Sequence, residues 1–179
     1  MSELSEALGI CADLLYYPEE EIKHEFARLF SLVGSTNKVD EILEGKSLSD
    51  LQSHYISMFD VKFGGVECVP YESWWSKKRL MGNEALNVEK FYERCGFRYN
   101  RDEFKMPPDH ISIEIGFLSL LIEEKRFEEA CKMVREHLGW VNKFYECVKD
   151  KSKIYGEILS ILVNFLNKIK KGEVCLSES

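Results

Sequence analysis

Apolar residues recur with the 3.6-residue period of an α-helix along most of this chain, and no segment alternates convincingly as a β-strand would. Before residue 60, these stripes predict helices over 4–15, 22–30, 39–43 and 48–59. Pro18 ends the first helix, because proline disfavours a helical conformation in the residue before it. Gly34 ends the second, and Ser47 or Ser49 can cap the helix that begins at residue 48.

The segment 60–71 interrupts the pattern. It contains two glycines and a proline but also several large apolar residues, so we expect it to pack against the protein rather than lie in solvent. Helical periodicity then resumes, apart from a charged connector over 98–106. The helices predicted in this half lie around 74–75, 88–95, 108–125, 126–138, 138–149 and 154–169, with Pro107 and Pro108 opening the third of them.

These patterns predict an all-α fold: one single-domain bundle of about eight to ten helices over 1–172, with a buried central helix and no sheet of three or more strands. The length of 179 residues suits one domain, since domains commonly span about 100–200 residues. Residues 173–179 are expected to form a disordered tail.

The segment 110–122 is apolar on two sides of its helix, which is typical of a buried helix. One side carries Ile111, Ile115, Leu118 and Ile122, and the other carries Ile113, Phe117, Leu120 and Leu121. A strip of small residues between them, Ser112, Gly116 and Ser119, lets a neighbouring helix approach closely. We therefore expect this helix to be central, with Ile111, Ile115, Phe117 and Leu118 nearly inaccessible to solvent.

Three polar residues mark the start of this helix. Asp109 stands in its first turn, where a carboxylate complements the helix dipole, and His110 and Glu114 lie four residues apart on one face. One interpretation is structural, with Asp109 as a cap and His110 as a hydrogen-bonded packing residue. Another is a general acid and base, although no nucleophile accompanies them. The other histidines lack metal-ligand spacing, so no metal site is expected.

Residues 69–75 read Val-Pro-Tyr-Glu-Ser-Trp-Trp. Pro70 fixes the backbone before a helix start, and Ser73 can cap that helix. Trp74 and Trp75 point about 100° apart on a helix, so both are not expected to be buried in one place. Either one lies in the core while the other covers the segment 61–69, or the pair forms a partly exposed aromatic shelf for a peptide.

The net charge of −7 and the pI of about 5.3 argue against nucleic acid as a partner, because phosphate binding requires a basic face. An acidic balance suits a cationic partner instead. No run reaches the roughly 18 apolar residues of a membrane span, and the N-terminus is acidic where a signal peptide is basic. We therefore expect a cytoplasmic protein with no membrane insertion. The six cysteines form no C-x-x-C pair and are expected to be reduced, mostly buried thiols.

The motifs, taken in order, resemble those of the TorD/DmsD/NarJ family of redox-enzyme maturation chaperones, nearer its TorD/DmsD branch. Tyr55-x-x-Met58-Phe59, followed by Pro70-Tyr71-x-Ser73-x-Trp75, is similar to the family's Y-x-x-L-F and P-P-Y-x-S-x-aromatic region. Pro107-Pro108-Asp109-His110 is similar to its E-P-x-D-H motif, with Met106 where a glutamate is usual. His137-Leu138-x-Trp140-x-x-x-Phe144 is similar to its H-L-x-x-W-x-x-x-F pattern, one residue shorter. The likeness covers roughly residues 4–165.

The resemblance implies a non-catalytic protein without a cofactor. Such chaperones bind the twin-arginine leader, or another part of the apo-subunit, of a molybdenum-cofactor oxidoreductase and hold it in the cytosol until the cofactor is inserted. Some family members have been discussed as nucleotide-binding, but this chain has no phosphate-binding glycine loop, so no nucleotide site is predicted. The chain is expected to be a monomer or a domain-swapped dimer.

A twin-arginine leader joins a cationic segment to an apolar one, so its receptor needs carboxylates beside a hydrophobic surface. We expect a peptide groove between 70–75 and the start of the 108–125 helix. The predicted groove residues are Pro70, Tyr71, Glu72, Ser73, Trp74, Trp75, Pro108, Asp109, His110 and Glu114. Their aromatic rings would contact the apolar stretch, and Glu72, Asp109 and Glu114 would meet the arginines. The alternatives are a helical adaptor without leader binding and a hydrolase using Asp109, His110 and Glu114.

Overall fold

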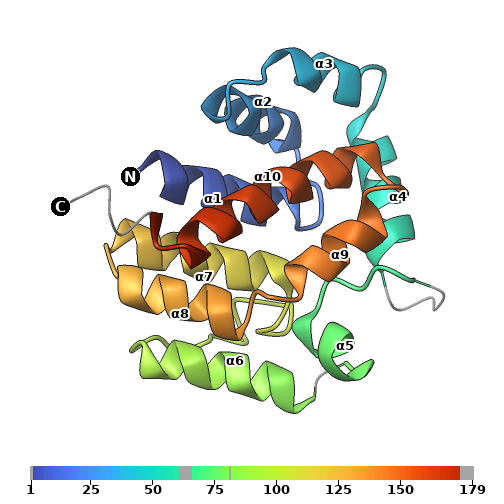
Figure 1. The fold of residues 1–179 in the computed structure, drawn as a ribbon. Coiled ribbons are helices and arrows are strands. Elements are labelled where there is room, and N and C mark those ends of the chain that lie inside the picture. Colours follow the sequence, from blue (N-terminus) through green and yellow to red (C-terminus); the bar gives the residue numbers. More distant parts are fainter. Residues whose placement is uncertain (1, 61–65, 81, 174–179) are drawn as a thin grey trace.

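The computed structural model describes residues 2–60, 66–80 and 82–173. These residues form ten α-helices (Figure 1): α1 (Glu3–Leu14), α2 (Ile22–Leu32), α3 (Asn37–Leu43), α4 (Leu48–Phe59), α5 (Glu72–Lys77), α6 (Asn83–Arg94), α7 (Ile111–Glu123), α8 (Phe127–Glu136), α9 (Val141–Val148) and α10 (Lys153–Lys170). In the same residues, the only β feature is an isolated antiparallel bridge between Tyr71 and His110. The prediction of an all-α single domain of eight to ten helices is confirmed. The predicted tail lies outside the described residues from position 174 onward.

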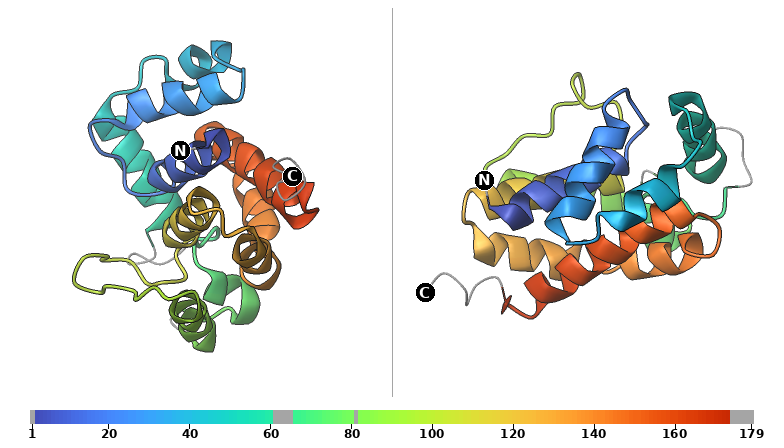
Figure 2. Two further views of the ribbon diagram at one scale, coloured as in Figure 1. Left: turned by 90° about the vertical axis from the view of Figure 1, so that its left-hand side faces the viewer. Right: turned by 90° about the horizontal axis from the view of Figure 1, so that it is seen from above.

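Helix α7 lies at the centre of the bundle (Figures 1 and 2). Helix α1 runs along one side of it and α8 along another. Helix α10, the longest at 18 residues, packs across α1, α8 and α9. Helix α2 covers the outer side of α1, α3 packs against α2 and α10, and α5 packs against α6. None of the described helices is long and apolar enough to cross a membrane.

The predicted strip of small residues on α7 forms the close contact with α1. Ser119 donates a hydrogen bond from its hydroxyl to the carbonyl oxygen of Ser5 at 2.7 Å. A methyl group added at Gly116 would lie 3.9 Å from the Cβ atom of Ala12. On α1, a methyl group at Gly9 would approach the hydroxyl oxygen of Ser119 to 3.4 Å. The small side chains therefore allow the two helix backbones to pack closely, as the sequence predicts.

The burial of α7 is confirmed on one of its two apolar sides. Ile111, Ile115 and Leu118 are completely buried. The prediction is wrong for Phe117, which is only partly buried. Its ring packs edge-on against Phe91 and contacts neighbouring aromatic rings, but no helix covers this side of α7 completely. The second apolar side therefore borders an open cleft.

Two predicted helix starts are also wrong. Pro107 and Pro108 precede α7 instead of opening it, because they form a turn in which the amide of His110 donates to the carbonyl of Pro107 at 3.0 Å. The α7 cap is His110, whose Nδ1 accepts from the amide of Ser112 at 3.2 Å. Ser73 does not cap α5 but lies within it, while Tyr71 occupies the cap position without a side-chain bond. By contrast, Ser47 caps α4 as predicted.

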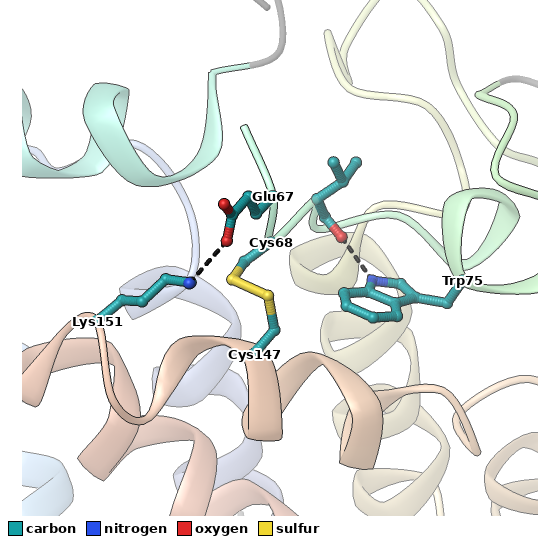
Figure 3. Close-up of a disulfide and its surroundings, with 6 residues drawn as sticks. Glu67, Cys68, Trp75, Cys147 and Lys151 are labelled. Atoms are coloured by element: carbon teal, nitrogen blue, oxygen red, sulfur yellow. Dashed lines mark hydrogen bonds and ion pairs between the residues drawn. A yellow bond between two sulfur atoms is a disulfide. The ribbon is translucent and has the colours of Figure 1, made fainter. Parts of the chain in front are cut away.

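Residues 66–70 pack on the bundle, which confirms the prediction for the described part of the segment 60–71; residues 61–65 lie outside it. Cys68 and Val69 are buried, and Cys68 forms a disulfide with Cys147 of α9 (Figure 3). The prediction of reduced thiols is therefore wrong for this pair. Its members are 79 residues apart, so local spacing rules do not detect them. Among the other described cysteines, Cys11 and Cys95 are buried free thiols, as predicted, and Cys131 is buried as well.

Candidate functional site

The two segments predicted to form the site lie side by side. The residues before α5 run antiparallel to those before α7. The amide of Glu72 donates to the carbonyl of Asp109, and the amide of Ile111 donates to the carbonyl of Pro70, each at 3.0 Å. These bonds frame the isolated bridge, so the starts of α5 and α7 are held as one rigid unit. We call this unit the α5–α7 junction.

Asp109 ties the junction together through its side chain. Its carboxylate is completely buried, and Oδ2 accepts a hydrogen bond from the amide of Ser73 at 3.0 Å. This bond satisfies a free backbone amide in the first turn of α5, a six-residue helix that lacks its own side-chain cap. Asp109 was predicted to meet leader arginines. Its burial and this bond give it the role of positioning α5 instead.

His110 is buried between two tyrosines. Its ring centre lies 5.0 Å from that of Tyr71 and 6.4 Å from that of Tyr16, both in edge-on contact. Burial lowers the pKa of His110 to about 3, so the ring is neutral near pH 7. Because Nδ1 accepts the bond from Ser112, the proton of this neutral ring resides on Nε2. His110 therefore caps α7 and packs against the ring of Tyr71.

A second buried polar group lies behind the junction. Glu114 is completely buried and accepts a hydrogen bond from Nε1 of Trp140 at 3.1 Å. Burial, with a further contribution from the Glu72 carboxylate, raises the pKa of Glu114 well above its usual value. Nδ1 of His137 lies 3.2 Å from Oε2 of Glu72. Glu114 is thus inaccessible to arginine side chains, contrary to the prediction, and Glu72 alone of the three predicted carboxylates retains surface access.

Buried polar side-chain atoms without a hydrogen-bond partner gather at this junction in the described part of the chain. They are Ser73 Oγ, Trp74 Nε1, Asp109 Oδ1, His110 Nε2, Glu114 Oε1 and His137 Nε2. Unpaired buried polar groups destabilise a fold, and their concentration in one place is typical of a functional region. His137 belongs to this group, and Trp140 donates to Glu114 beside it, although neither was predicted as a site residue. The His-Leu-x-Trp motif was the signal that could have placed them there.

The accessible part of the junction is aromatic. Tyr71, Trp74 and Trp75 are all partly exposed. Trp75 donates from Nε1 to the carbonyl of Val69 at 2.7 Å (Figure 3). Its ring also lies edge-on to the core ring of Phe144. Neither tryptophan is fully buried, and Trp75 packs against the core while it bonds to Val69, so the aromatic shelf stays a prediction.

The shelf already holds a cation. The ammonium of Lys78 lies 4.6 Å from the ring centre of Trp75 and 5.4 Å from that of Trp74. Cationic groups are attracted to the faces of aromatic rings. The same rings can therefore receive a guanidinium group from another chain.

Catalysis by Asp109, His110 and Glu114 is not supported by this geometry. His110 hydrogen-bonds within its own helix, Glu114 to Trp140, and Asp109 to α5. Each is thus engaged with a different partner and buried. Among the described residues, no group of three or more His, Cys, Asp or Glu side chains is arranged to hold a metal ion.

Comparison with known proteins identifies similarities of two kinds. The sequence model of a family described as nitrate reductase delta subunit matches residues 31–147. Among solved structures, a crystal structure from Archaeoglobus fulgidus described as a redox enzyme maturation protein is 26% identical, with a TM-score of 0.70, over 94% of this chain and 96% of that chain. No curated protein sequence matches this one. The family match includes both segments of the α5–α7 junction.

Proposed function

Because the chain belongs to the nitrate reductase delta subunit family, a family of redox-enzyme maturation chaperones, we propose that it binds the twin-arginine leader, or the apo form, of a molybdoenzyme subunit. In this proposal it holds that subunit in the cytoplasm for cofactor insertion before export. The family and the structural similarity make the protein a maturation chaperone and not an enzyme. The family also implies a molybdoenzyme subunit as its partner.

The α5–α7 junction is the observation that carries this proposal. Two motifs more than thirty residues apart in sequence are joined there by backbone hydrogen bonds and by the Asp109 carboxylate. The junction presents a partly exposed aromatic surface beside the carboxylate of Glu72. An apolar surface with a carboxylate at its edge is the complement of a peptide that joins arginines to an apolar stretch.

The predicted groove residues divide into two roles in this proposal. Tyr71, Glu72, Trp74 and Trp75 contact the client peptide, because they have accessible surface. The other residues are buried and hold these four in place; they are Pro70, Ser73, Pro108, Asp109, His110 and Glu114. Loss of a contact residue should therefore weaken binding with little effect on stability, whereas loss of a buried one should reduce both.

The test is the affinity of synthetic twin-arginine leader peptides for the wild type and for Trp74→Ala and Glu72→Gln variants, measured by fluorescence anisotropy. Each variant should raise Kd about tenfold, the usual effect of losing an anchor residue. Ile56→Ala is the control, since Ile56 is an exposed apolar residue of α4 and not one of the predicted groove residues. Wild-type affinity in both junction variants would exclude the junction as the contact surface.

A further inference from the structure

The second apolar side of α7 borders a cleft that none of the described helices fills. The cleft has a volume of about 320 Å³ and lies between α1, α7 and the connector that follows α6. Its apolar wall on α7 is formed by Ile113, Phe117 and Leu120. Figure 2 shows the connector, in yellow-green, looping out beside α1 and α7.

The opposite wall of this cleft is aromatic. Phe97, Tyr99 and Phe104 face it from the connector, and Phe104 keeps 43% of its surface accessible. Leu120 on the α7 side keeps 36%. Large exposed apolar residues gathered around one hollow mark an interaction surface rather than ordinary surface variation. We call this cleft the α7 groove.

One end of the α7 groove opens into an acidic hollow. Asp13, near the end of α1, lines both the groove and a neighbouring cleft of about 340 Å³. The neighbouring cleft is lined further by Glu19, Glu21 and Glu25, together with Tyr16, Tyr17 and Ile22. Among the described residues, Arg28 pairs with Glu25 and Glu6 at 3.1 and 2.6 Å, and Nδ1 of His24 lies 3.8 Å from Glu25. The four carboxylates that line the hollow outnumber these two groups.

Electrostatics at Asp13 support a cationic occupant. Partial burial, followed by the charge of Glu25, raises the pKa of Asp13, and Arg28 offsets only part of this rise. A further positive group would stabilise the ionised form of Asp13. Arg98 also lines the groove, and the next cleft is lined by Lys105 and by Arg101, which pairs with Glu89. The excess of carboxylates therefore lies in the hollow at α1–α2, beside Asp13.

We infer that the α7 groove binds the apolar stretch of the client's twin-arginine leader, with the two arginines seated in the acidic hollow around Asp13, Glu19 and Glu21. This inference rests on the proposed function and assigns the leader an orientation. The arginines point toward α1–α2, where they oppose the carboxylates, and the apolar residues cover Ile113, Phe117 and Leu120. Tyr16 lines the acidic hollow and its ring contacts His110, so the hollow adjoins the α5–α7 junction. In this arrangement Tyr71, Glu72, Trp74 and Trp75 contact the leader residues next to the arginines.

The experiment uses three synthetic peptides: an Arg-Arg peptide with an apolar stretch, the same peptide with both arginines changed to glutamine, and a version with serines in place of the apolar stretch. Each is titrated against the full-length wild type and two groove variants. Leu120→Glu puts a charge into the apolar wall, and Glu19→Gln with Glu21→Gln neutralises the acidic hollow. Ile56→Glu and Glu20→Gln are the matched controls. Ile56 is as exposed as Leu120, and Glu20 is an exposed carboxylate between the two that are changed.

For the wild type, each peptide change should weaken binding about tenfold. Leu120→Glu should weaken the binding of the Arg-Arg peptide by at least about tenfold and remove the advantage of the apolar stretch. The Glu19→Gln and Glu21→Gln variant should remove the difference between the arginine and glutamine peptides. The control variants should bind as the wild type does, and thermal unfolding should show that all variants are folded.

The outcomes separate this inference from the proposed function. If the groove variants bind the Arg-Arg peptide like the wild type while Trp74→Ala weakens it, the inference is overturned and the proposed function stands. If the wild type binds none of the peptides, leader binding is overturned as well. If the groove variants weaken the binding of all three peptides equally, the groove does not recognise the arginines or the apolar stretch, and the inference is again overturned.

Discussion

Reduction of the Cys68–Cys147 disulfide should destabilise the protein without unfolding it at room temperature. The bridge closes a loop with a sequence separation of 79 residues. Loop-closure entropy for a loop of that length gives about 4–5 kcal/mol of stabilisation at 25 °C. In a domain of this size, each kcal/mol corresponds to roughly 2–4 °C, so we expect reduction to lower Tm by about 8–20 °C.

The native position of residues 66–70 should survive reduction, because two other contacts flank the bridge (Figure 3). Glu67 pairs with Lys151 at 2.7 Å, and Trp75 donates to the carbonyl of Val69 at 2.7 Å. The ion pair is exposed and contributes little. The buried cysteine and valine side chains contribute more, because their burial removes apolar surface from water.

The assay is thermal unfolding followed by circular dichroism, with and without a thiol reductant. Alkylation and mass spectrometry of the unfolded protein count the free thiols in each sample. A Cys68→Ser and Cys147→Ser double variant is the control, and its Tm should not respond to the reductant. The reasoning fails if the non-reduced protein yields six alkylated cysteines, or if the oxidised and reduced forms unfold at the same temperature.

Three further predictions concern α7. Ile115→Ala should lower the free energy of unfolding by about 2–5 kcal/mol in chemical denaturation, because Ile115 is fully buried. Leu120→Ala should lower it by less than about 1 kcal/mol, because Leu120 borders the groove. Equal losses in the two variants would contradict the assigned burial. Burial raises the pKa of Glu114 in the folded state, so its stabilising contribution exists below the unfolded pKa and is lost as pH rises through the folded pKa. The Tm of Glu114→Gln should therefore rise relative to that of the wild type as pH increases. A Tm difference between the two proteins that does not change with pH would refute this. Burial lowers the pKa of His110 to about 3, so the free energy of unfolding should fall by up to about 1.4 kcal/mol per pH unit as pH drops from 6.5 toward 3. His110→Asn keeps a capping acceptor and should lose less stability between pH 6.5 and 4 in urea unfolding. The same pH slope in this variant and in the wild type would contradict the assignment.

The sequence predicted that the two segments of the α5–α7 junction lie side by side, but it did not predict which of their residues are accessible and which are buried. The motifs around Pro70 and Asp109 placed the segments together, and the backbone bonds between them agree. The sequence could not show which carboxylates remain accessible. Asp109 and Glu114 were assigned to arginines because of their charge, but burial decides that question, and only Glu72 keeps surface access.

The periodicity of the sequence by itself determined the helices, the all-α class and the close contact of α7 with a neighbour through its small residues. These features depend on neighbours three and four residues away, which the sequence displays directly. Tertiary structure alone decided the partners of distant residues. It paired Cys68 with Cys147, gave the α5 cap to Asp109 and left Phe117 beside an open groove. A helical wheel gives the direction in which a side chain points, whereas the packing of other elements decides what it meets there.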